Sequence, residues 1–306
     1  MNILARVFRD APSAQQSNVK GITFMIIACA SFACGDTIMK LSSARVPTSE
    51  LIFLRGCFVT TASFLLAASL GALAMLPRAL NWTMAARASG DATGAWGFQM
   101  ALARVPYADL AAISQLVPLS ITAASALFLG EKVGWRRWLA TAAGLLGVLL
   151  IIRPGTDAVN WWALGGIISV FGATLRDLAT RRVDRGIPPP VIMFLSASFV
   201  TLTALAVAPF STWQWPQASI VLAMSAAAVF SLCGQMCVII SVRAGELSSV
   251  APFRYAIIVF AIISGFFVFG HSPDLVTLMG MAVVASAGLY TFYREQALRR
   301  RSRLPA

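Results

Sequence analysis

Ten long apolar runs, separated by short polar or proline-containing breaks, constrain the fold of this chain more than any other feature. A helix needs about 20 apolar residues to cross the roughly 30 Å of hydrocarbon in a bilayer. The chain of 306 residues is 58% hydrophobic and 12% charged, about half the charged fraction of a soluble domain. We therefore predict an all-α integral membrane protein and exclude a soluble enzyme. The predicted spans are 19–41, 51–73, 82–103, 107–129, 135–152, 160–182, 189–210, 217–242, 247–270 and 274–293.

Positive charges are distributed unevenly between the two sides of the predicted membrane. With the amino terminus in the cytoplasm, the segments on that side hold 17 Lys and Arg residues and those on the other side hold 4. Because cytoplasmic loops are enriched in Lys and Arg, both chain ends are predicted to lie inside the cell. The net charge of +12 and the basic tail from Arg299 to Arg303 are then assigned to membrane lipid, not to nucleic acid.

The second half of the chain repeats features of the first at a constant offset in residue number. Since five spans is an odd number, the second copy must enter the membrane from the opposite side, and the two halves are inverted. Inverted repeats are typical of secondary transporters, which hold substrate near the middle of the membrane. The matching pairs are Asp36 with Asp177, Lys40 with Arg181, Pro47 with Pro188, and Phe53-Leu54 with Phe194-Leu195.

Short sequence motifs occupy corresponding places in the two halves. They are Glu50-Leu51 with Leu54-Arg55, Ala112 to Pro118, Gly130-Glu131-Lys132, and Ala143 to Leu150 in the first half, then Ser248 to Pro252 and Gly280 with Gly288 in the second. On these residues, about 20 to 293 of the chain resembles the ten-helix EamA-type exporters of the drug/metabolite transporter superfamily. It departs from their pattern at Gly270, which is followed by His271 where the first half has Glu131.

This resemblance implies ten transmembrane helices arranged as two inverted five-helix repeats around a central cavity. The corresponding division is a cytoplasmic tail (1–18), two repeats (19–153 and 154–293) and a basic cytoplasmic tail (294–306). The implied function is export of small metabolites, with aromatic or apolar amino acids as substrates, across a bacterial inner membrane by alternating access. The alternatives are a carrier of an anionic metabolite such as a nucleotide-sugar, a membrane-embedded lipid-modifying enzyme, and a channel. Either a monomer or a homodimer fits the sequence.

Polar side chains inside the spans are candidates for the wall of a substrate cavity, because an unpaired polar group is costly in an apolar medium. Arg254 lies roughly 10 Å into its span at about 1.5 Å per residue, where it could receive a substrate carboxylate. Hydrogen bonding or packing between helices is the alternative role for each candidate. The candidates are Trp96, Gln99, Tyr107, Gln115, Gln235, Arg254 and Tyr255.

Charged residues near the span ends suggest gates. Asp36 and the Arg176-Asp177 pair lie in the equivalent first helices of the two halves, near opposite faces of the membrane. We hypothesise that they form alternating gate contacts, with a solvated helix end as the alternative. Arg55 is expected to extend its side chain to the membrane surface, and Arg87 and Asp91 to form a local i, i+4 pair.

Two prolines and the only histidine complete the candidates. Pro118 and Pro252 lie inside the fourth and ninth spans, where a missing N–H permits a kink, so both are predicted hinges. His271 lies at the predicted outer end of the ninth span and is expected to be inert. Five cysteines without CxxC spacing give no metal or disulfide signal, and no nucleotide-binding or metalloprotease motif is present. No cofactor and no catalytic residue is predicted.

Overall fold

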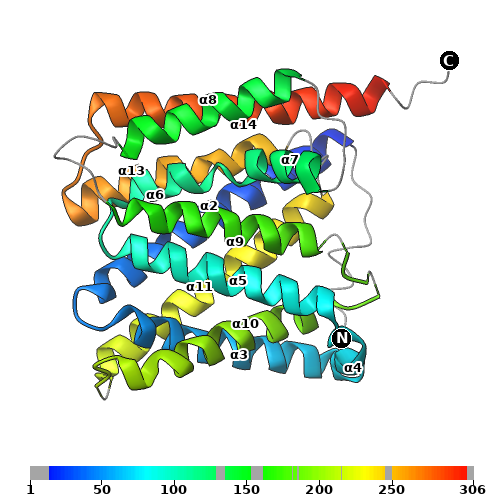
Figure 1. Ribbon diagram of the computed structural model, residues 1–306. Helices are drawn as coiled ribbons and strands as arrows, with labels where there is room; N and C mark the ends of the chain where they lie inside the picture. Colours follow the sequence, from blue (N-terminus) through cyan, green and yellow to red (C-terminus); the bar gives the residue numbers. More distant parts are fainter. Residues whose placement is uncertain are drawn as a thin grey trace.

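The computed structural model describes residues 14–128, 135–152, 161–180, 182–184, 186–214, 216–244 and 250–301. Within these ranges all regular secondary structure is helical, as predicted (Figure 1). The first half contains α2 (Ala14–Ser43), α3 (Thr48–Ser69), η1 (Ala72–Met75), α4 (Leu76–Ala79), α5 (Trp82–Leu102), α6 (Tyr107–Ser114), α7 (Val117–Phe128) and α8 (Trp135–Ile152). The second contains α9 (Ala163–Thr180), α10 (Pro189–Val207), η2 (Ala208–Phe210), α11 (Ala218–Ala244), η3 (Ala251–Tyr255), α13 (Ala256–Phe269) and α14 (Leu275–Arg301).

The described helices make ten passes across the bundle, which agrees with the predicted fold class. The fourth pass is α6 followed by α7, and the ninth is η3 followed by α13. Helix α2 begins, and α14 ends, on the right of Figure 1, and we call this the terminal side of the bundle. The opposite side is the one where α2 ends and α6 begins. Helices α2 and α14 extend into the predicted tails, while the Gly130-Glu131-Lys132 motif lies outside the described residues.

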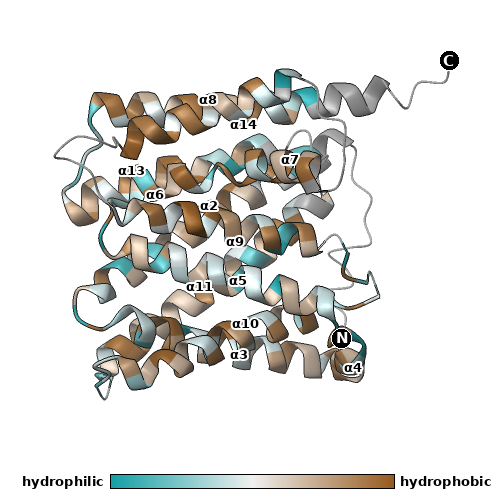
Figure 2. Cartoon of the chain, viewed as in Figure 1, coloured by the Kyte–Doolittle hydropathy of each residue, from teal (hydrophilic) through white to brown (hydrophobic). Residues whose placement is uncertain are grey.

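The outward faces of the helices are apolar over most of their length. Large side chains such as Phe267 (78% exposed) and Leu222 (71% exposed) point away from the protein, and the hydrophilic residues gather mainly at helix ends and loops (Figure 2). An apolar surface of this extent is unfavourable in water and fits a hydrocarbon environment.

Helices α5 and α9 are absent from the six helices that are both long and apolar enough to be assigned as spans by hydropathy alone. They instead pack against each other through glycines. A Cβ atom added at Gly97 would lie 2.6 Å from the Gly165 carbonyl oxygen, and one added at Gly90 would lie 2.6 Å from the backbone nitrogen of Arg176. Small residues let helix backbones touch in this way, so dispersion and close packing stabilise a pair that hydropathy underrates.

The helix pairs follow the symmetry of an inverted repeat. Helix α2 packs mainly on α11 and α5 on α9, and exchanging the two halves converts one pair into the other. Helices α3 and α10, and likewise α8 and α14, are each packed on their own counterpart, as a two-fold axis between the halves requires. On that axis, the hydroxyls of Thr60 and Thr201, which occupy equivalent positions in the two halves, form a hydrogen bond of 3.3 Å.

Candidate functional site

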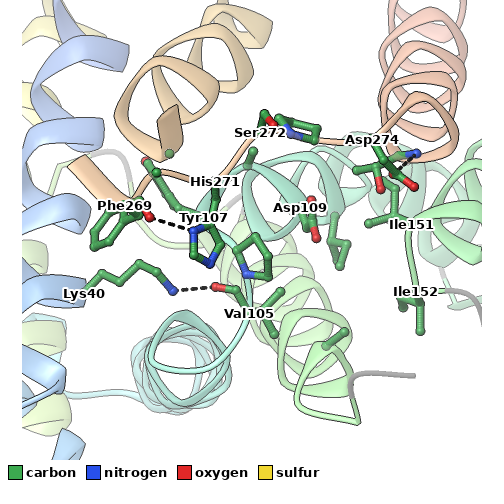
Figure 3. A pocket seen from close by; sticks show the side chains of 18 residues that line it. Lys40, Val105, Tyr107, Asp109, Ile151, Ile152, Phe269, His271, Ser272 and Asp274 are labelled. Atoms are coloured by element: carbon green, nitrogen blue, oxygen red, sulfur yellow. Dashed lines mark hydrogen bonds between the residues drawn. The ribbon is translucent and has the colours of Figure 1, made fainter. Parts of the chain in front are cut away.

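A cavity of about 620 Å³ opens at the opposite side of the bundle (Figure 3). Its wall is built from the end of α2, the start of α6, the end of α8, the start of α9 and the turn between α13 and α14. Apolar side chains form much of the wall, among them Val105, Ile113, Ile151, Ile152 and Phe269. Besides the phenol of Tyr107, four ionisable side chains line it, from Lys40, Asp109, His271 and Asp274.

Lys40 is held at the cavity wall by the end of helix α5. Its ammonium group donates hydrogen bonds of 2.6 Å to the carbonyl oxygens of Leu102 and Val105. Leu102 is the last residue of α5 and Val105 lies in the loop that follows. The last carbonyls of a helix have no partner inside the helix, so a lysine is well placed to satisfy that of Leu102. The ring of Phe269 lies 5.5 Å from the same nitrogen, within range of a cation–π contact. Since an ammonium has three N–H donors, two carbonyls leave capacity for a further acceptor.

The other three ionisable residues of the cavity lie on helix ends and the connecting turn. Asp109 is in the first turn of α6, and its charge interacts with that of Lys40. Asp274 caps helix α14 by accepting a hydrogen bond of 3.0 Å from the Thr277 backbone N–H. Nδ1 of His271 lies 2.7 Å from the Phe269 carbonyl oxygen. Because a carbonyl oxygen only accepts, Nδ1 carries the proton in this contact.

A polar cluster adjoins the cavity, and we call it the Asp36 cluster. Tyr107 lines the cavity, and its hydroxyl donates a hydrogen bond of 3.2 Å to Asp36. The charge of Asp36 also interacts with that of Arg55 in helix α3. Arg55 is half-buried, so the prediction that it extends to the membrane surface is wrong: the nearby carboxylate holds it inside the bundle.

A second, larger cluster lies on the terminal side, and we call it the Asp177 cluster. Asp91 forms ion pairs with Arg87 (3.0 Å) and with Arg176 (3.4 Å), and Arg176 also pairs with Asp177 (2.8 Å). The expected Arg87–Asp91 pair is therefore confirmed and extended. Arg87 further donates to the hydroxyls of Thr180 in α9 and Ser196 in α10, so the cluster joins three helices.

The two clusters stand in related places. The offset that relates Asp36 to Asp177 also relates Arg55 to Ser196. In the first cluster α3 itself supplies the arginine that faces the carboxylate of α2. In the second, the equivalent position holds Ser196, and the arginine that reaches it comes from α5.

Of the seven predicted cavity residues, Tyr107 lines this cavity and the other six lie elsewhere. Trp96 is half-buried and donates from its indole nitrogen to Thr203 of α10, at 3.1 Å. Gln99 is buried in α5, Gln115 and Gln235 are half-buried, and Arg254 is exposed. The hydroxyl of Tyr255 is buried without a hydrogen-bond partner among the described residues, and it packs directly on Gly288.

The helix breaks fall at the two predicted hinge prolines. Helix α6 ends at Ser114 and α7 begins at Val117, one residue before Pro118. Pro252 lies in the 3₁₀ turn η3 that precedes α13. There the Cys29 thiol approaches the carbonyl oxygens of Phe253 and Arg254 at 3.7 and 3.6 Å. Both passes are thus discontinuous helices, while the motion of a hinge stays a prediction.

Sequence reasoning missed most of the ionisable residues of the cavity. His271 was expected to be an inert surface residue, and it lines the cavity instead. Lys40, Asp109 and Asp274 stand next to predicted loops, and a search for polar residues inside spans passes over them. The usable signal was their topology, because these loops all lie on one side of a ten-pass bundle.

Comparison with known proteins shows which family the sequence matches. The model of the EamA-like transporter family matches twice, over residues 19–153 and 160–293. A riboflavin transporter of Rhizobium johnstonii is 26% identical over 290 residues, covering 94% of this chain and 95% of that protein. An S-adenosylmethionine uptake transporter of Rickettsia conorii is 22% identical, covering 92% and 96%.

Two further matches cover nearly the same part of the chain. The pseudopaline exporter CntI of Pseudomonas aeruginosa is 26% identical, covering 87% of this chain and 94% of that protein. A solved crystal structure superposes with a TM-score of 0.60 at 18% identity, over 95% of this chain and 100% of the other. At that identity the superposition shows a shared fold.

Proposed function

Because the chain belongs to the EamA-like transporter family, we propose that it is a secondary carrier that works by alternating access. One observation carries the proposal: a charged cluster lies at each end of the bundle. Each cluster contains a carboxylate from the first helix of one repeat, Asp36 or Asp177. Such clusters can close one side of a carrier while the other side opens.

The bonds between separately packed helix pairs are the candidates for the gates. Helix α2 packs on α11 and α5 packs on α9, so each pair is expected to move as a unit. At the opposite side, the bond from Tyr107 to Asp36 ties α6 to α2. At the terminal side, the bond from Arg87 to Ser196 ties α5 to α10. Arg176 and Asp177 position Arg87 through the shared Asp91, and the breaks at Pro118 and Pro252 serve as hinges.

The substrate class that we propose is an amino acid with an apolar or aromatic side chain. Lys40 can meet a carboxylate, Asp109 can meet an ammonium group, and the apolar wall suits the side chain. Of the substrates named for relatives, S-adenosylmethionine itself carries an amino-acid group. A nucleotide-sugar would bring several negative charges to a wall that holds two aspartates beside Lys40, so we rank it below a zwitterion. The proposal contains no catalytic step.

The proposed setting is the inner membrane of a bacterium, with both chain ends in the cytoplasm and export as the net direction. The excess of positive charge on the terminal side supports this orientation. Relatives are named both for uptake and for export, so the direction has to be measured.

The test is transport by the full chain in proteoliposomes. Saturable exchange of labelled phenylalanine or leucine, competed by unlabelled amino acids, is the expected result. Riboflavin and S-adenosylmethionine serve as rival substrates in the same assay. Lys40→Gln should raise the KM for an amino acid about 10-fold or more, since it removes a charge-assisted hydrogen bond, while exposed Arg45→Gln should leave it unchanged. A flux that is linear in substrate concentration would contradict a carrier.

A further inference from the structure

A second hollow, independent of the proposed transport site, lies on the outer face of the bundle between α8 and α14. It is a groove of about 580 Å³. Its floor is made of small side chains, with Ala140 and Ala287 buried. Larger exposed side chains, from Trp135, Leu139 and Tyr290, stand along its edges.

The groove follows from how the two helices cross. They touch where a Cβ atom added at Gly147 would lie 2.9 Å from the Gly280 carbonyl oxygen. From there toward the terminal side, alanines replace bulky side chains and leave a recess over residues 135–143 of α8. This stretch of helix spans about 12 Å at about 1.5 Å per residue. That length is most of the roughly 15 Å depth of one leaflet, half of a hydrocarbon core of about 30 Å.

Charge and aromatic groups are confined to one end of this apolar groove. Arg136 is exposed there, and its guanidinium lies 5.4 Å from the centre of the Trp135 ring. Trp and Tyr are favoured at the boundary between headgroups and hydrocarbon, which places Trp135, Arg136 and Tyr290 at headgroup depth. We propose that the groove binds one anionic phospholipid, with an acyl chain over the alanine floor and the phosphate at Arg136.

A second copy of the chain fits this face less well. A two-fold dimer through α8 and α14 would place the same surface on both subunits. Two grooves would then face each other and leave a void, and each Arg136 would approach its equivalent. A lipid, in contrast, fills a concave apolar surface and neutralises the cation.

Native mass spectrometry of the full chain in detergent tests this proposal, with phosphatidylglycerol and phosphatidylcholine of the same acyl chains. One basic residue near an anionic headgroup favours binding by about 1 kcal/mol, so phosphatidylglycerol should bind about 5-fold more tightly. Arg136→Gln should abolish this preference, and the control Arg78→Gln, which changes an exposed arginine of α4, should keep it. Ala282→Phe, which fills the groove from an exposed position, should lower binding of both lipids.

A salt titration of the unmodified chain gives a result that does not depend on the folding of any variant. The preference should shrink as ionic strength screens the pair. Equal binding of the two lipids, a preference that survives Arg136→Gln, or a dimer that Ala282→Phe dissociates would each overturn the proposal.

Discussion

Removing the hydroxyl of Ser196 is the sharpest perturbation of the proposed terminal-side gate. Ser196 is 5% exposed and accepts a hydrogen bond from Arg87, whose side chain is 14% exposed. Ser196→Ala changes no charge and leaves the ion pair of Arg87 with Asp91 intact. It therefore isolates the one bond of the cluster that reaches α10.

The size of the effect follows from the burial of this bond. A hydrogen bond to a charged group contributes about 1.5–3 kcal/mol. Because Ser196 and the Arg87 side chain are both largely buried, screening by water should not reduce this contribution much. A free-energy difference of about 1.4 kcal/mol corresponds to a factor of ten in a population ratio. The ratio of molecules open to molecules closed at the terminal side should then rise about 10- to 100-fold.

Pulsed electron paramagnetic resonance can measure this ratio. In a cysteine-free chain, spin labels would replace exposed Trp82 at the start of α5 and exposed Asp184 in the segment before α10. Ser196→Ala should enlarge the long-distance population. Ser225→Ala is the control, because that hydroxyl donates to the Leu222 carbonyl within its own helix. Identical distance distributions for the parent chain and Ser196→Ala would refute the assignment of this bond to a gate.

Two further predictions concern packing and the other gate. Gly97→Ala should destabilise the fold by about 1–3 kcal/mol through overpacking, since the new methyl would lie 2.6 Å from the Gly165 carbonyl oxygen. Thermal unfolding should show this loss of stability. The control Thr93→Ala, at an exposed position of the same helix, should show no loss. Asp36→Asn should weaken closure at the opposite side, because the amide still accepts from Tyr107 but no longer attracts Arg55; labels on that side should show more open molecules, and an unchanged distribution would count against the gate.

The ten passes could be predicted because burial in lipid leaves a strong, local signal. The third and sixth passes are informative exceptions. Helices α5 and α9 carry Asp91, Arg176 and several glycines, and hydropathy alone does not select them. Dropping the third span would have made the number of spans odd, and the constant offset pairs Asp36 of the first span with Asp177 of the sixth. The stability of α5 and α9 comes from packing against each other, and the mean hydropathy of one helix does not include its contacts with another helix.

The cavity could not be predicted to the same degree, because tertiary structure assembles it from chain segments that are distant in sequence. Lys40 and His271 belong to opposite halves of the chain and meet only when the fold brings one side of the bundle together. Gln99 and Trp96 had the chemistry of a cavity wall, but a polar group in a helical bundle is equally well satisfied by a neighbouring helix. For Trp96, Thr203 is that neighbour. The sequence specifies polarity along a helix and not which neighbour will use it.

The unequal chemistry of the two clusters suggests which side of the carrier closes more firmly. In the terminal-side cluster, Asp91 is shared by two arginines, and Arg87 reaches two other helices. The Asp36 cluster sets one arginine and one tyrosine against one carboxylate. The shared Asp91 holds the guanidinium of Arg87 in place, so the bond from Arg87 to buried Ser196, which joins α5 to α10, is made by a preorganised donor. We therefore expect a carrier built from two similar halves to rest closed at the terminal side, which agrees with a cavity that opens at the opposite side.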